Sequence, residues 1–143
     1  MQTKELTIER YDEVLALMKA TPGICVREAD SREAVARYLI RNPGLSFVAE
    51  EKGRVVGCAM SGHDGRRGYV QHVVVDPAFR RRGVAQSLVS RCLDALALSG
   101  ITKAHLDVLA TNELALGYWQ RRGWTRREDI VRFSITPSTN PNA

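Results

Sequence analysis

The hydrophobic pattern of residues 69–100 changes once, from the period of a strand to that of a helix. Val73–Val75 is a short β-branched run suited to a buried strand. Asp76-Pro77 ends this strand, because proline has no N–H to donate. The apolar residues that follow recur every three or four positions and define one stripe of a helix, which Gly100 can end. This stripe consists of Val84, Ala85, Leu88, Val89, Cys92, Leu93 and Leu96.

The same periodicities predict strands and helices along the rest of the chain. The predicted order is strand 5–9, helix 11–20, helix 31–41, hairpin 46–51 and 54–61, strand 69–76, the helix ending near 100, strand 101–109, helix 112–122, and strands 124–127 and 130–135. Asp30 and Glu33 resemble a capping box for the second helix. In the strand of residues 54–61, Val56, Cys58 and Met60 are expected on one face. In the last strand, Val131, Phe133 and Ile135 alternate as one buried face requires.

Composition and charge narrow the class of protein. The chain of 143 residues is 44% hydrophobic, which predicts one domain over residues 1–136 and a frayed tail at 137–143. The sequence contains no apolar run near the roughly 20 residues that span a bilayer, so no membrane segment is expected. Its three cysteines, Cys25, Cys58 and Cys92, lack disulfide or zinc spacing, which predicts a reducing, cytoplasmic location and no metal site. The net charge of +5 suits an anionic cofactor and is weak evidence for nucleic acid.

The turn after the central strand carries the clearest candidate chemistry. Gly83 lets the backbone approach a ligand closely, because it has no Cβ. The first N–H groups of the following helix lack partners within the helix and suit a phosphate or pyrophosphate. Arg80, Arg81 and Arg82 add positive charge. The alternative is a solvated basic turn before an ordinary helix.

These residues resemble a known family. Arg80-x-x-Gly83-Val84-Ala85, directly after Val73–Pro77, resembles the acetyl-CoA pyrophosphate loop of the GNAT N-acetyltransferases. Residues 106–108, Asn112-x-x-Ala115 and Gly123-Trp124 resemble the next strand, helix and final strand of that family. The resemblance covers roughly residues 4–136. Residues 62–68 and His72 are most similar to small bacterial YpeA-like members.

The resemblance implies an α/β fold with a cofactor site. The expected fold is a mixed, mostly antiparallel twisted sheet of six to seven strands with about four helices, around a central strand-helix-strand parallel unit. The fourth and fifth strands of the family splay apart, and the pantetheine arm of acetyl-CoA lies between them. The implied cofactor-binding residues are Val73, Val74, Val75, Arg80, Arg81, Arg82, Gly83, Val84, Ala85, Gln86, Asn112 and Trp119.

Acetylation of an amine requires a base, because an alkyl ammonium must lose a proton before it attacks a thioester. Asp107 matches a position where some family members have a glutamate that is proposed as the base. The alternative is that Asp107 lies on the exposed face of the strand and has no catalytic role. His72 can take a proton near neutral pH or serve as a hydrogen-bonded sheet histidine. Tyr69 matches a further position of an acidic base, but a phenol is a poor base at neutral pH.

The general acid departs from the family pattern. The tyrosine of the family falls on Trp119 here, and Tyr118 is one residue early, which is a turn of roughly 100° on a helix. An indole N–H can donate a hydrogen bond but cannot deliver a proton. Three options follow. Trp119 only stabilises or packs on the thiol end of the cofactor, Tyr118 reaches the thiol through a local distortion of the helix, or the thiolate leaves without an acid from the protein.

The sequence therefore predicts an acetyl-CoA-dependent N-acetyltransferase that acts by direct transfer in a ternary complex. Its partner is an amine acceptor of unknown identity. A non-catalytic acyl-CoA-binding module is an alternative suggested by Trp119, and a basic nucleic-acid-binding domain is a remote one. A homodimer through the final strands is a further expectation.

Overall fold

The computed structural model describes all 143 residues, which form two compact units, Met1–Leu106 and Asp107–Ala143. The first unit contains one five-stranded sheet and three α-helices. The second contains one α-helix followed by chain without regular secondary structure. No helix has both the length and the apolar character needed to cross a bilayer.

The sheet has the strand order β1-β2-β3-β4-β5. Its strands are β1 (Gln2–Glu5), β2 (Phe47–Glu51), β3 (Arg54–His63), β4 (Gly68–Val75) and β5 (Ala104–His105). The first four pair antiparallel in succession, and β5 joins β4 in parallel. The mixed α/β class and the parallel unit around the helix α3 (Val84–Leu98) are thereby confirmed, whereas the predicted six to seven strands are wrong.

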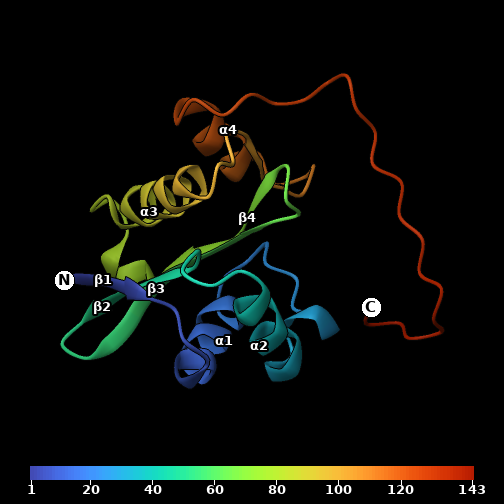
Figure 1. Cartoon of the computed structure of the whole chain (residues 1–143). Helices are drawn as coiled ribbons and strands as arrows, with labels where there is room; N and C mark the ends of the chain where they lie inside the picture. The colour runs from blue at the N-terminus through green and yellow to red at the C-terminus, as the bar shows by residue number, and fades with distance from the viewer. The chain divides into compact units, whose positions relative to one another are not determined.

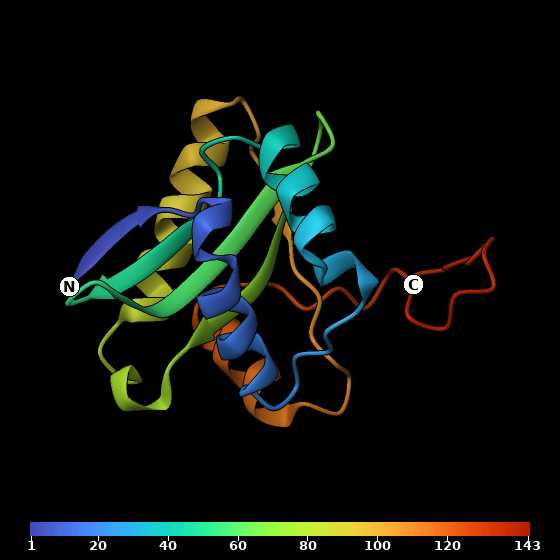
Figure 2. The same ribbon diagram turned by 90° about the horizontal axis from the view of Figure 1, so that it is seen from below.

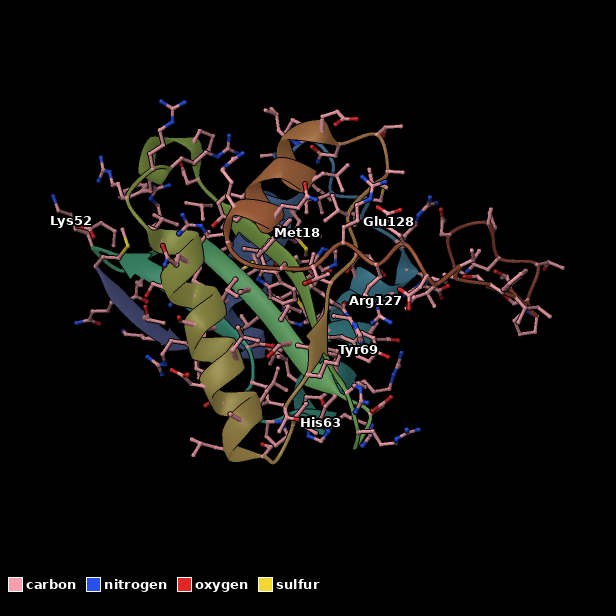
Figure 3. All side chains as sticks on the ribbon, turned by 90° about the horizontal axis from the view of Figure 1, so that it is seen from above. Met18, Lys52, His63, Tyr69, Arg127 and Glu128 are labelled. Atoms are coloured by element: carbon pink, nitrogen blue, oxygen red, sulfur yellow. The ribbon has the colours of Figure 1, made fainter.

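Helices cover both faces of this sheet (Figure 1). The helices α1 (Tyr11–Lys19) and α2 (Arg32–Arg41) lie on one face, which Figure 2 shows from the front, and α3 lies on the other. In Figure 3, α3 crosses in front of the strands and Met18 of α1 lies behind them. Lys52 marks the turn between β2 and β3, and His63 marks the opposite end of β3. With α4 (Glu113–Arg121), the four helices match the predicted number.

Two apolar layers hold the first unit together. The layer under α1 and α2 is formed by Leu6, Tyr11, Val14, Met18, Val35, Val48, Val55, Cys58, Met60 and Val74. The layer under α3 is formed by Phe47, Ala49, Val56, Ala59, Val84, Leu88 and Cys92. Burial of these side chains supplies the main driving force for folding of this unit.

A bulge in β3 changes which residues share a face. Ala49 pairs with Gly57 and Glu50 with Val55, so Val56 is an extra residue on the β3 side. Val56 packs in the α3 layer, while Cys58 and Met60 pack in the α1 layer. The prediction of one shared face was therefore wrong for Val56, because strict alternation holds only in an unbulged strand.

A second bulge lies in β4. Cys58 pairs with Val74 and Met60 with Gln71, so His72 and Val73 together oppose Ala59. His72 has the left-handed φ of +47°. That conformation costs a residue with a side chain roughly 1–2 kcal/mol, and bulges of this kind re-aim side chains beside functional sites.

Two predictions near the N-terminus need correction. The strand expected at 5–9 is instead β1, because the chain turns through the 3-10 helix Ile8–Arg10 directly into α1. The cap of α2 is Ser31, whose Oγ accepts from Ala34 N–H at 3.1 Å. Asp30 lies one residue earlier, in the 3-10 helix Glu28–Asp30, and its carboxylate accepts a hydrogen bond from Arg27 N–H instead of capping α2.

The predicted last strands do not form. Beyond His105 the chain leaves β5, and residues 122–143 contain no helix or strand. The side chains of Val131, Phe133 and Ile135 are 77%, 93% and 89% exposed. Alternation specifies which side of a strand would be buried but does not supply a neighbouring strand. The homodimer loses the strands on which it was placed, and it stays a prediction.

Candidate active site

The N-terminus of α3 follows β4 through a short basic loop. Asp76 accepts from Ala78 N–H at 2.9 Å and caps the 3-10 helix Pro77–Phe79. Gly83 then adopts φ +76°, which favours glycine, and forms the N-cap of α3. The first helical hydrogen bond runs from Ser87 N–H to Gly83 O at 3.0 Å. The N–H groups of Val84 and Ala85 precede this bond at the start of the helix, which is the arrangement that binds phosphate.

The three arginines of this loop play different structural roles. Arg80 Nε donates to the carbonyl of Val75 at 3.2 Å and ties the loop to the end of β4. The guanidinium of Arg82 lies 5.1 Å from the ring centroid of Phe79. Arg81 is exposed and has φ +62°. The loop thus presents three permanent cations beside the α3 N-terminus, where a pyrophosphate would be stabilised.

One edge of β4 lacks a neighbouring strand over most of its length. β5 pairs with β4 only through Gly68–Ala104 and Tyr69–His105. Residues 70–75 of β4 extend beyond this pairing. An extended chain of amides can bond such an edge in the manner of an added strand. This length of β4 that β5 does not pair leads directly into the basic loop.

His72 is bonded to Asp30 at the bulge in β4. Its Nε2 lies 2.6 Å from Oδ1 of Asp30, and the two side chains are 18% and 8% exposed. The other carboxylate oxygen of Asp30 accepts from Arg27 N–H at 2.9 Å. The carbonyl of Asp30 accepts from the hydroxyl of Tyr11 at 2.5 Å. This network joins β4 to the segment between α1 and α2.

The pKa of Asp30 is lowered from its ordinary value. Burial favours the protonated form, but the hydrogen bonds from His72 and from Arg27 N–H outweigh it, and the charge of His72 acts in the same direction. Asp30 is therefore ionised at neutral pH despite its burial.

The remaining candidate residues belong to the second unit. Asp107 is 72% exposed and lies 3.1 Å from Arg132, and it is outside β5, so the strand predicted over residues 101–109 is wrong at this position. Asn112 caps α4 by accepting from Ala115 N–H at 3.1 Å. The rings of Tyr118 and Trp119 meet edge to face at 5.0 Å, and Trp119 meets Trp124 at 5.5 Å. The roles predicted for these residues stay predictions.

Two of the three thiols are unsuited to nucleophilic catalysis. Burial raises the pKa of Cys58 to about 12 and that of Cys92 to about 11. A thiol attacks as its thiolate, so both side chains are inert core residues. Cys25 is exposed in the segment after α1.

Sequence reasoning assigned His72 as a candidate but missed its partner. Asp30 was interpreted as a helix cap, and Tyr11 as an ordinary helix residue. Asp30 and His72 are 42 residues apart, a separation that no local periodicity connects. The available signal was an acidic side chain beside Ser31, because only one of the two can cap α2.

Comparisons with known proteins identify an acetyltransferase family. The model of the acetyltransferase (GNAT) family matches residues 11–124. An acetyltransferase of Pectobacterium atrosepticum is 38% identical over 92 residues, which cover 64% of this chain and 65%, just under two thirds, of that protein. An acetyltransferase of Yersinia enterocolitica is 33% identical over 102 residues, covering 71% and 72%. The crystal structure of the PaiA N-acetyltransferase from Thermoplasma acidophilum in complex with coenzyme A shares the fold, with a TM-score of 0.73, 14% identity and coverage of 85% and 87%.

Proposed function

Because the chain belongs to the GNAT acetyltransferase family, we propose that it moves an acetyl group from acetyl-CoA to a primary amine by direct transfer in a ternary complex. The single observation that carries this proposal is the continuity of the unpaired β4 edge with the basic loop and the α3 N-terminus. The acceptor is a small molecule or a protein amine.

The residues of the first unit fit acetyl-CoA in two places. The first turn of α3 after Gly83, from Val84 to Gln86, offers N–H groups to the pyrophosphate, and Arg80–Arg82 supply charge. The main chain of Val73–Val75 offers hydrogen bonds to the pantetheine amides, while the side chains of Val73 and Val75 pack in the α3 layer. Because only the main chain of these residues is assigned to the cofactor, their apolar side chains are compatible with a polar ligand.

The reaction needs a base and gives up two protons from nitrogen. We assign the base to His72, which is bonded at the β4 bulge. His72 takes one proton from the acceptor ammonium, and the neutral amine attacks the thioester carbonyl. The C–N bond forms, the C–S bond breaks, and the second nitrogen proton goes to the departing thiolate to give CoA. His72 then releases its proton to water, so the balance closes.

A covalent acetyl-enzyme is not part of this proposal. The buried thiols of Cys58 and Cys92 have raised pKa values, which supports direct attack by the amine. Asp107 is an alternative base. The second nitrogen proton reaches the departing thiolate through Tyr118 or through solvent, and Trp119 can only stabilise the thiolate by a hydrogen bond.

The first test is a thermal shift with acetyl-CoA, with CoA and ATP as controls. A ligand at about 100 times its Kd stabilises by ~2.7 kcal/mol, which raises the Tm by several degrees. We expect shifts with acetyl-CoA and CoA and none with ATP. No shift in folded protein would reject the cofactor site, whereas shifts without CoA release on any amine would favour a non-catalytic acyl-CoA-binding module.

A further inference from the structure

Asp30 anchors the segment between α1 and α2 to the bulge of β4. Each of its three oxygens has a hydrogen-bond partner: Oδ1 lies 2.6 Å from His72 Nε2, Oδ2 accepts from Arg27 N–H, and the carbonyl accepts from the hydroxyl of Tyr11. The side chain is 8% exposed, so it is held in one orientation. A buried carboxylate with this set of partners is a rigid acceptor.

The chemistry of that acceptor fixes the tautomer of His72. The lowered pKa of Asp30 keeps it ionised at neutral pH. An ionised carboxylate accepts hydrogen bonds and cannot donate them. Nε2 of the neutral imidazole must therefore carry the proton, which leaves Nδ1 with a free lone pair.

We propose that Asp30 is a positioning residue that holds His72 in its Nε2–H tautomer and thereby makes Nδ1 the atom that takes the proton from the acceptor ammonium. The assignment rests on the proposed function. When Nδ1 accepts that proton, the ring becomes an imidazolium with both nitrogens protonated. The carboxylate of Asp30 stabilises this cation without itself taking a proton.

The location of the pair supports this role. His72 directly precedes Val73, in the part of β4 that β5 does not pair with. The bulge fixes its backbone at φ +47°, and Asp30 fixes its ring. The groups around the pair are Tyr11 of α1, Arg32 of α2, whose guanidinium lies 5.8 Å from the Tyr11 ring, and Cys58 of β3, whose thiol meets the His72 carbonyl at 3.4 Å.

The tautomer can be measured without any ligand. Long-range ¹H–¹⁵N correlation spectra of the wild-type protein at pH 8 will show His72 with a protonated Nε2. The chain has only three histidines, and loss of one signal set in His72→Asn assigns the spectrum. Asparagine suits this position because it tolerates a positive φ. A wild-type Nδ1–H tautomer would overturn the proposal.

The variant Asp30→Asn should reverse the tautomer. The amide oxygen of the new asparagine keeps the hydrogen bond from Arg27 N–H, so its NH₂ group faces Nε2 of His72. An NH₂ group only donates, so Nε2 must accept the hydrogen bond. The proton then moves to Nδ1. Asp94→Asn makes the same chemical change on the exposed surface of α3 and should leave the tautomer unchanged. Asp30→Glu should restore the Nε2–H form, since it restores a carboxylate.

Turnover separates positioning from cofactor binding. CoA release is measured with acetyl-CoA and three probe amines: spermidine, an aminoglycoside and a tripeptide with a free α-amine. For the best acceptor, Asp30→Asn should lower kcat by about 10²-fold, the size of a lost general base, with the KM for acetyl-CoA within about twofold. Asp94→Asn should match the wild type.

The outcomes distinguish this inference from the proposed function. An active wild type with equal kcat in folded Asp30→Asn would overturn the positioning role alone. A wild type that binds acetyl-CoA but releases no CoA with any amine would overturn both the transferase assignment and the role of Nδ1. Partial recovery of kcat in Asp30→Glu would support positioning over a purely structural role.

Discussion

Gly57 of β3 lies directly against Val84, the first residue of α3. A Cβ at Gly57 would meet Val84 Cγ1 at 3.2 Å, Leu88 Cδ1 at 3.3 Å and the carbonyl of Val74 at 3.3 Å. These separations are tighter than ordinary van der Waals contact, so the glycine sets how closely the helix N-terminus approaches the sheet. The proposed phosphate site and the sheet are therefore coupled through one missing methyl group.

Replacement of Gly57 by alanine should consequently weaken both the fold and cofactor binding. We expect Gly57→Ala to destabilise by about 1–3 kcal/mol through overpacking and to raise the Kd for acetyl-CoA. Urea unfolding and isothermal titration would measure the two effects. Gly117→Ala in α4 is the control, because there the new Cβ meets only the flexible end of Arg121. Equal affinity in Gly57→Ala would show that the α3 N-terminus is not in the site.

A charge at Gly83 should abolish acetyl-CoA binding. Gly83→Glu introduces a carboxylate against the pyrophosphate and a side chain at φ +76°. Gly100→Glu makes the same change at φ +85° at the other end of α3, and nothing lies within 4 Å of an added Cβ at either site. Both variants should lose similar stability, while only Gly83→Glu loses the thermal shift with acetyl-CoA. A retained shift would remove the loop from the cofactor site.

The free energy of unfolding of the first unit should decrease at acidic pH, because Asp30 becomes protonated there. Its pKa is lower in the folded chain than the ordinary value of 3.8, so the folded state binds fewer protons than the unfolded state. The contribution of Asp30 is complete above pH 3.8 and is lost as the pH falls through the lower folded value. Asp30→Asn should be about 1–3 kcal/mol less stable at pH 7, and the difference should narrow below pH 3.8.

Urea unfolding of both proteins at pH 7, 5 and 3 would measure that difference. The exposed variant Asp94→Asn gives the reference for a change of net charge. A gap between wild type and Asp30→Asn that stays constant from pH 7 to pH 3 would contradict the assignment.

The two candidate bases can be ranked by substitution. His72→Asn should lower kcat by about 10²-fold or more, because it removes the proton acceptor at the bulge. Asp107→Asn should have a smaller effect on kcat, since Asp107 is 72% exposed and paired with Arg132. Steady-state kinetics with saturating acetyl-CoA would compare them. A larger loss in Asp107→Asn would transfer the role of base to Asp107.

Local patterns predicted those parts of the chain whose structure is determined by neighbouring residues. The run from β4 through Pro77 and Gly83 to Gly100 was expected as strand, turn and helix, and the structure contains it. The hairpin turned at Lys52-Gly53 and helices α1, α2 and α4 were also predicted. Each depends on periodicity, a cap or a breaker that lies within a few residues.

The parts that were missed depend on distant partners. The bulge at His72 follows from the pairing of β4 with β3, and the bond from His72 to Asp30 spans 42 residues. Phe133 has the alternation of a strand residue but is 93% exposed, in a segment that forms no strand. A sequence pattern indicates which side chains of a segment can be buried together, but their burial also needs a packing partner from a distant part of the chain.

The bulge in β4 also changes how a mutational scan of that strand should be interpreted. Gly68 faces Leu96 of α3, whereas beyond the bulge the odd-numbered Val73 and Val75 pack in the α3 layer. The positions most sensitive to bulky replacements on that side should therefore change from even to odd numbers at His72. Deletion of one residue there would remove the bulge and restore one regular alternation along β4, with Val73 and Val75 still facing α3.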